Sequence, residues 1–142
     1  MKILALDYGV KNIGLALTDV EGNFAFAYDT LRVETQNFAS LQKIIADLKN
    51  ICAKEKVEKI IIGLPVQLSG ENSSATVAVF EFVKQLEQGI GLPVETIDER
   101  WSTMQAHKIS RDRSRPVRAN NIDALSAQIL LQGYLEKIRI TN

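Results

Sequence analysis

The stretch that decides the interpretation of this chain lies near its start and reads Lys2-Ile3-Leu4-Ala5-Leu6-Asp7-Tyr8-Gly9. An apolar run closed by Tyr-Gly predicts a short buried strand that ends in a turn. Asp7 closes this run, and a carboxylate beside apolar residues is costly unless it is paired, protonated or bound to a metal. Gly9 and Gly14 allow the backbone and a ligand to approach closely. Asp7 is therefore the first candidate functional residue, although a turn-forming Asp gives the same local pattern.

Outward from this strand, the chain predicts an α/β fold in one domain over residues 1–142. Apolar runs at 13–18 and 24–33, separated by short spacers, predict two further strands in hairpins. A helix at 37–54, a strand at 57–64, a helix at 74–88 and a strand at 93–97 follow, and Asn120 or Asn121 can cap a final helix that extends to residue 138. Three antiparallel strands followed by parallel strands give a five-stranded mixed sheet with helices on both faces. Ligands of such sheets gather near the carboxyl ends of the parallel strands.

The composition excludes several kinds of site. Cys52 is the only cysteine and His107 the only histidine, which excludes a zinc site built from Cys and His and a Ser-His-Asp triad. Cys52 falls in an apolar helical pattern, so we expect a buried, inert thiol. The sequence shows no signal peptide and no membrane span, and we expect a cytoplasmic protein. Because the formal net charge is zero, attraction to nucleic acid would have to come from a local patch.

Two adjacent acidic residues, Asp98 and Glu99, end the fifth predicted strand. Neighbouring side chains on a strand face opposite ways, so only one of the two can join Asp7. We select Glu99 and keep Asp98 as its competitor, a choice that rests partly on the family resemblance described below. An exposed acidic strand end paired with Arg100 is the simpler alternative.

Asp123 supplies the third carboxylate, in the first turn of the final predicted helix. The helix dipole favours an acid at this place in any case. However, Asp123 shares a helical spacing with Ala127, Leu130, Leu131 and Tyr134, which places it on the face that packs against the sheet. Converging carboxylates raise one another's pKa unless a cation neutralises them, and oxygen ligands suit Mg²⁺ or Mn²⁺. Asp7, Glu99 and Asp123 are thus the predicted catalytic residues and metal ligands, in a site of the kind that cleaves phosphodiesters.

A basic segment between Glu99 and Asp123 indicates the substrate. Residues 100–118 contain six basic residues and one acidic residue, Asp112. Arginine forks match phosphate oxygens, and such contacts hold a nucleic-acid backbone without reading its sequence. A merely solvated loop is the alternative. The predicted nucleic-acid-binding residues are Lys11, Arg100, Lys108, Arg111, Arg113, Arg115 and Arg118.

Four motifs resemble those of the YqgF family, which are RuvC-like resolvases also described as pre-16S rRNA nucleases. They are Leu6-Asp7-Tyr8-Gly9 with Gly14, Gly63-Leu64-Pro65 with Ser69-Gly70, Asp98-Glu99-Arg100 with Ser102-Thr103, and Asp123 followed by Ala127, Ile129 and Leu130. The resemblance covers the whole chain and implies an RNase H-like fold with Asp7, Glu99 and Asp123 as its acidic residues. Ser126, where the family more often has Ala, is a small departure in packing.

The resemblance also implies a nuclease that matures the 5′ end of small-subunit ribosomal RNA. We therefore favour precursor rRNA as the partner, with pre-ribosomal particles as a further partner. Branched DNA is the alternative, but junction cleavage needs two symmetric sites, and we expect a monomer or weak dimer. A catalytically silent nucleic-acid-binding module is a second alternative. A third is an actin-like kinase, which opens with a similar motif but binds ATP between two domains.

Overall fold

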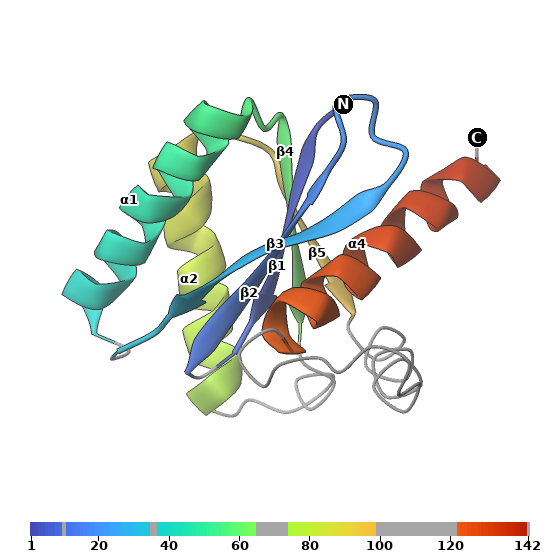
Figure 1. The fold of residues 1–142 in the computed structure, drawn as a ribbon. Coiled ribbons are helices and arrows are strands. Elements are labelled where there is room, and N and C mark those ends of the chain that lie inside the picture. The colour runs from blue at the N-terminus through green and yellow to red at the C-terminus, as the bar shows by residue number, and fades with distance from the viewer. Residues whose placement is uncertain (10, 35–36, 65–73, 99–121, 142) are drawn as a thin grey trace.

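The structure, a computed structural model, describes residues 1–9, 11–34, 37–64, 74–98 and 122–141 (Figure 1). Its elements are β1 (Ile3–Tyr8), β2 (Asn12–Thr18), β3 (Ala25–Arg32), α1 (Phe38–Glu55), β4 (Lys59–Leu64), α2 (Ser74–Ile90), β5 (Val94–Asp98) and α4 (Ile122–Thr141). This order confirms the one predicted from the sequence. The predicted caps Asn120 and Asn121 lie outside the described residues.

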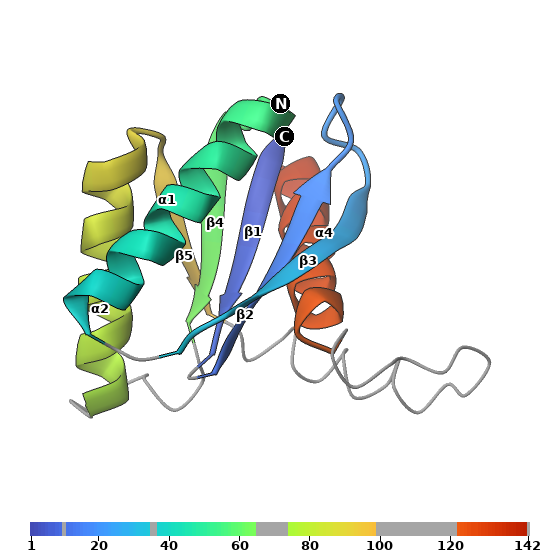
Figure 2. The ribbon, with the colours of Figure 1, turned by 60° about the vertical axis from the view of Figure 1, so that its left-hand side comes forward.

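The five strands form one mixed sheet in the order β3-β2-β1-β4-β5. Strands β1, β2 and β3 pair antiparallel, whereas β1 pairs parallel with β4 and β4 with β5. The central strand β1 therefore joins the antiparallel half to the parallel half. Figure 2 shows that β1, β4 and β5 all finish at the end of the sheet where α4 begins.

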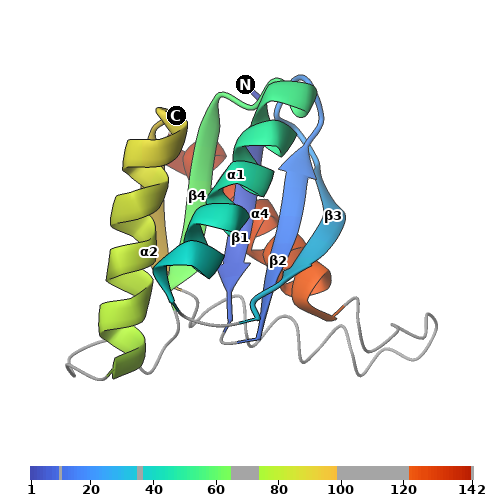
Figure 3. The same cartoon turned by 90° about the vertical axis from the view of Figure 1, so that its left-hand side faces the viewer.

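Helices cover both faces, as expected: α1 and α2 lie on one face and α4 on the other (Figure 3). Strand alternation divides the side chains of β1 between these layers. Leu4, Leu6 and Tyr8 belong to the core beneath α1 and α2. Ile3 and Ala5 belong to the core beneath α4. Both faces of β1 are thus covered, which explains its uninterrupted apolar sequence.

The two faces of β2 differ in the size of their side chains. On the α1 and α2 side, β2 presents Ile13, Leu15 and Leu17, all of them buried. On the opposite side the same strand presents Gly14 and Ala16, and Ala16 packs in the core beneath α4. Small residues let a helix backbone approach the sheet closely. The small residues of β2 therefore let α4 pack closely on one face, while its large residues pack beneath α1 and α2 on the other.

Hydrogen bonds from α4 hold the start of the edge strand β3. The Gln128 side-chain amide donates to the Ala25 carbonyl oxygen at 3.1 Å, and the Gln132 amide oxygen accepts from the Ala25 N–H at 3.3 Å. These glutamines stand four residues apart and so lie on the same face of the helix. They satisfy backbone groups of β3 and fix α4 against the antiparallel half of the sheet.

Helix ends follow the expected signals closely. The Asn37 side-chain oxygen caps α1 by accepting from the Ser40 N–H at 2.8 Å. Helix α2 ends at Ile90, and Gly91 follows with φ +77°, a conformation that glycine adopts without strain. Gly91 therefore ends this helix. None of the helices in the described ranges is long and apolar enough to cross a membrane.

Lys59 connects α4 to the parallel half of the sheet. Its ammonium group donates to the Tyr134 hydroxyl at 2.7 Å and pairs with the Glu95 carboxylate at 2.9 Å. The Lys59 hydrogen bond lowers the pKa of Glu95 below its ordinary value of 4.5. The ionised pair therefore stabilises the fold above that pH.

We predict that Lys59→Met lowers the free energy of unfolding by about 0.5–1.5 kcal/mol at pH 7. The methionine keeps much of the apolar stem but loses both polar contacts. Because the pKa of Glu95 is lowered, the ion-pair contribution is lost as the pH falls below 4.5, and the difference from wild type should shrink there. Urea unfolding at several pH values measures this, with Lys49→Met on exposed α1 surface as the control. A deficit that is constant down to pH 3 would show that the pair contributes nothing.

Candidate active site

Asp7 stands at the carboxyl end of β1, on the face covered by α4. Its neighbours Leu6 and Tyr8 point to the other face, where the Tyr8 ring lies 4.8 Å from that of Phe82 in α2. This packing fixes the end of β1 and therefore the direction of the Asp7 side chain. Asp7 itself is only partly buried. The sheet thus holds one carboxylate at the end where ligands of such folds bind.

Gly14 brings the second carboxylate to the same place. It pairs with Asp7 across β1 and β2, and it lies directly beneath the start of α4. A Cβ on Gly14 would overlap the backbone carbonyl of Asp123 and would come within 2.9 Å of the Ala124 nitrogen. The first turn of α4 therefore occupies the space that any other residue at position 14 would fill. From the sequence we expected Gly14 to admit a ligand, and instead it admits the helix.

The charge of Asp7 acts on the carboxyl group of Asp123. Burial raises the pKa of Asp123 above its ordinary value of 3.8, and the negative charge of Asp7 raises it further. A cation beside such a carboxyl group favours its ionised form. The structure thus brings together two of the three predicted acids.

A second glycine, Gly63, is the neighbour of Asp7 on its other side. It is paired with Asp7 across β1 and β4, and with Ile97 across β4 and β5. Asp7 therefore lies between two glycines, Gly14 on β2 and Gly63 on β4. The start of α4 covers Gly14, and no side chain on β4 screens Asp7 at Gly63. Carboxylate oxygens are the donors that suit a hard cation such as Mg²⁺.

Several predicted site residues lie outside the described residues: Glu99, Arg100, Lys108, Arg111, Arg113, Arg115 and Arg118. Within the described ranges no group of three potential metal ligands occurs, so Asp7 and Asp123 form a pair. The backbone of Asp98 is the last described position of β5, opposite Leu64. Lys11 is exposed in the connection between β1 and β2, and its carbonyl accepts from the Val33 N–H at 2.7 Å.

Arg32 is a candidate that sequence reasoning missed. It lies two strands from Asp7, about 10 Å across the sheet, and two residues, about 7 Å, further toward the end where β1 finishes. Its side chain is exposed. With Lys11 it places two cations beside the acidic pair. Nothing in the local sequence distinguishes Arg32 from a solvated strand residue, because its position depends on the pairing of three strands.

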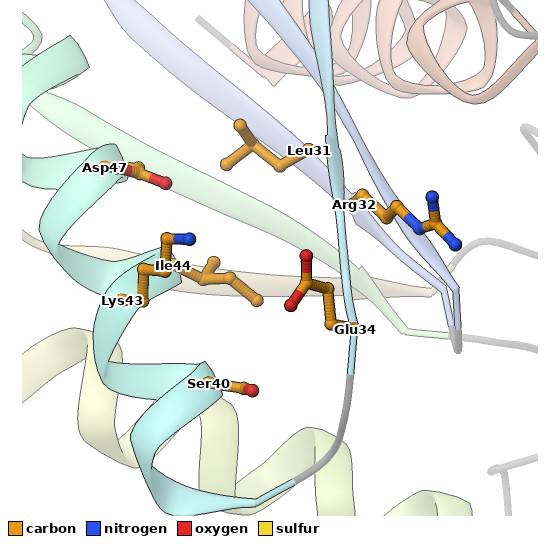
Figure 4. A pocket seen from close by; sticks show the side chains of 7 residues that line it. All are labelled: Leu31, Arg32, Glu34, Ser40, Lys43, Ile44 and Asp47. Atoms are coloured by element: carbon orange, nitrogen blue, oxygen red, sulfur yellow. The ribbon is translucent and has the colours of Figure 1, made fainter.

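A separate cavity of about 210 Å³ lies between β3 and α1. Figure 4 shows Lys43 and Asp47 of α1 on one side, Glu34 on the other, and Arg32 directed away from α1. Acidic and basic groups balance in its lining. Neither Asp7 nor Asp123 takes part in it, so it does not belong to the acidic pair.

Cys52 confirms the expectation of an inert thiol. It is buried in α1, and burial raises its pKa to about 11. A thiolate is therefore scarce at neutral pH.

Comparison with known proteins identifies the family. Residues 1–137 match the RuvX family, described as Holliday junction resolvase. The chain belongs to the RuvX family. This confirms the resemblance seen in the sequence motifs and replaces the actin-like kinase alternative.

Two relatives extend the comparison to named proteins. A protein of Clostridium kluyveri is 38% identical over 140 residues, covering 97% of this chain and 98% of the relative. A protein of Koribacter versatilis is 35% identical over 138 residues, covering 96% of this chain and 87% of the relative. Both relatives are named as pre-16S rRNA nucleases.

Solved structures confirm the RNase H-like fold. RuvC of Thermus thermophilus superimposes with a TM-score of 0.62 at 15% identity, covering 98% of this chain and 97% of RuvC. RuvC of the same organism in complex with a Holliday junction substrate gives a TM-score of 0.59 at 14% identity, covering 97% and 96%. At this identity the likeness establishes the fold alone.

We predict that Asp7→Asn raises the melting temperature of the metal-free protein by about 1–3 °C at pH 7. The variant removes the charge that disfavours ionisation of Asp123. Since the pKa of Asp123 is raised, its ionisation destabilises the fold at neutral pH, and this penalty disappears as the pH falls toward 3.8. The gain should therefore shrink on acidification. Thermal melts in EDTA measure it, with Asp47→Asn on exposed α1 surface as the control. A lower melting temperature than wild type would contradict the repulsion.

Proposed function

We propose that this RuvX-family chain is a nuclease that uses a divalent metal to hydrolyse phosphodiester bonds, and that it processes the 5′ end of pre-16S rRNA. The observation that carries the proposal is the apposition of Asp7 and Asp123 at the carboxyl end of β1, where Gly14 pairs with Asp7 and lies against the backbone of Asp123. Burial raises the pKa of Asp123, and the charge of Asp7 raises it further. Membership of the RuvX family and the names of the two relatives support the choice of reaction.

The proposed metal ligands are Asp7, Asp123 and Glu99. Ile97 of β5 packs with the core beneath α4, on the face of the sheet that carries Asp7. Glu99 follows it by two positions in the sequence, and the family motif Asp98-Glu99-Arg100 supports Glu99 over Asp98 as the middle ligand. Mg²⁺ or Mn²⁺ suits this all-oxygen donor set.

The chemistry divides between the ion and the protein. A bound divalent ion activates water and stabilises charge on the reacting phosphate. The chain contributes a fixed carboxylate on β1 and a second on α4. Because both acids are partly withdrawn from water and repel each other, the pair is prepared for a cation before substrate arrives.

The proposed substrate track begins with Lys11 and Arg32 beside the acids and continues through the basic residues of 100–118. These cations would hold phosphates on either side of the bond that is cut. We place the activity in the cytoplasm. The single buried Cys52 fits a reducing compartment, since disulfide pairs characterise secreted proteins.

A Holliday junction is the second candidate substrate. The description of the RuvX family and the RuvC complex with a junction favour it. Junction resolution requires two sites that act symmetrically, so a dimer would have to form on the DNA.

The first test is cleavage of precursor rRNA and of four-way DNA junctions with Mg²⁺, Mn²⁺ or EDTA. We expect rRNA cleavage that requires metal, and a loss on the order of 100-fold or more in Asp7→Asn, Asp123→Asn and Glu99→Gln. Asp98→Asn is the matched control, because it alters the neighbouring acid and should retain activity. Undiminished cleavage in EDTA would exclude the mechanism. If Asp98→Asn is inactive and Glu99→Gln is active, the middle metal ligand is Asp98 instead of Glu99.

The second test concerns the substrate track. We predict that replacing Arg111, Arg113, Arg115 and Arg118 with Ala flattens the salt dependence of RNA binding by about 3–4 units of log–log slope, and that Arg32→Ala flattens it by about 1. The melting temperature should change little, because Arg32 is exposed. Lys54→Ala, on exposed α1 surface, is the control. Unchanged slopes would show that these arginines are only solvated surface.

A further inference from the structure

We infer that Gly14 is a positioning residue, which sets the separation of Asp7 and Asp123 by letting the first turn of α4 rest on the backbone of β2. This inference rests on the proposed function for its meaning, but its geometry stands on contacts within the chain. It assigns a role to a residue that carries no chemistry of its own.

The first step of the argument is the tightness of the contact. An added Cβ at Gly14 would meet the carbonyl oxygen and carbonyl carbon of Asp123 as well as the Ala124 nitrogen. All three are backbone atoms, so no side-chain rotation can relieve the overlap. The whole first turn of α4 would have to move by roughly an ångström or more to restore ordinary contact distances.

The second step is that nothing else requires glycine at position 14. Gly22 and Gly91 have positive φ values, whereas Gly14 lies within β2 and does not have the positive φ that favours glycine. Glycine weakens a strand interior, so its presence there calls for a reason. The approach of α4 supplies one.

The third step links the contact to the acids. Gly14 pairs directly with Asp7, and its would-be Cβ meets the backbone of Asp123. A displacement at this single point therefore changes the separation of the two acids. The contact joins β2, which is paired with the strand that carries Asp7, to the first turn of α4, which carries Asp123. Other anchors of α4, such as the Gln128 bond to β3 and the Lys59 bond to Tyr134, lie further along the helix.

Gly89 offers a matched control. A Cβ there would come within 2.8 Å of the Ile45 Cγ2 atom, between α1 and α2 on the other face of the sheet. Gly89→Ala therefore also introduces a tight contact, but against a side chain instead of backbone and on the face of the sheet opposite α4. The Gly89→Ala variant therefore shows the effect of steric crowding alone, away from the two acids.

The experiment measures Mn²⁺ binding by calorimetry, without substrate or turnover. We expect Gly14→Ala to weaken Mn²⁺ binding at least tenfold while remaining folded, and Gly89→Ala to bind as wild type does. Asp123→Asn should bind Mn²⁺ weakly, and adding Gly14→Ala to it should cause little further loss, because both changes act on one carboxylate. Wild-type affinity in folded Gly14→Ala, or a full additional loss in the double variant, would overturn the inference.

A second variant approaches the contact from the helix. Ala124→Val adds bulk to the buried first turn of α4 and should reproduce the loss of Mn²⁺ affinity even if Gly14→Ala does not fold. Crystal structures of wild type and variant separate this inference from the proposed function. If wild type binds no Mn²⁺, the proposed function fails, yet a wider Asp7–Asp123 separation in the variant still supports positioning by Gly14. An unchanged separation excludes it.

Discussion

The contact between the bare backbone of Gly14 and the first turn of α4 is the constraint on which the candidate site depends. Antiparallel pairing places Gly14 beside Asp7, and the contact places Asp123 above it. Both acids therefore owe their proximity to one missing side chain. Burial raises the pKa of Asp123, and the charge of Asp7 raises it further. A fold selected only for stability would not place two carboxylates there, which is the physical reason for expecting a cation.

Side-chain size has the same effect along β2 beyond Gly14. Ile13, Leu15 and Leu17 pack in the core beneath α1 and α2, while Gly14 and Ala16 on the other face let α4 approach. Polar contacts then anchor α4 along its length, through Gln128 to β3 and through Lys59 to the parallel half. The helix that carries Asp123 is thus held against strands from both halves of the sheet. Such support keeps a carboxylate in place when its neighbour repels it.

The second feature of the chain is the distribution of its charges. Its net charge is zero, yet Lys11 and Arg32 stand at the end of the sheet that carries the acids, and six basic residues lie in 100–118. Lys11 and Arg32 therefore supply positive charge locally, at the end of the sheet where chemistry is proposed, although charge is balanced over the protein as a whole. The cavity between β3 and α1 has balanced acidic and basic groups in its lining and so has no local excess of positive charge.

The sequence by itself determined the order of the elements, the mixed sheet, the helices on both faces and the acids worth considering, because apolar periodicity and turn residues act locally. It also identified the family, since motifs such as Leu6-Asp7-Tyr8-Gly9 are local patterns. The alternation of Ile13 and Leu15 with Gly14 and Ala16 was a visible signal that one face of β2 receives a closely packed helix. Only the tertiary structure decided that Gly14 receives Asp123, that Gly63 flanks Asp7, and that Arg32 reaches the same end of the sheet. These relations depend on strand order and register between segments far apart in the chain, which no local pattern encodes.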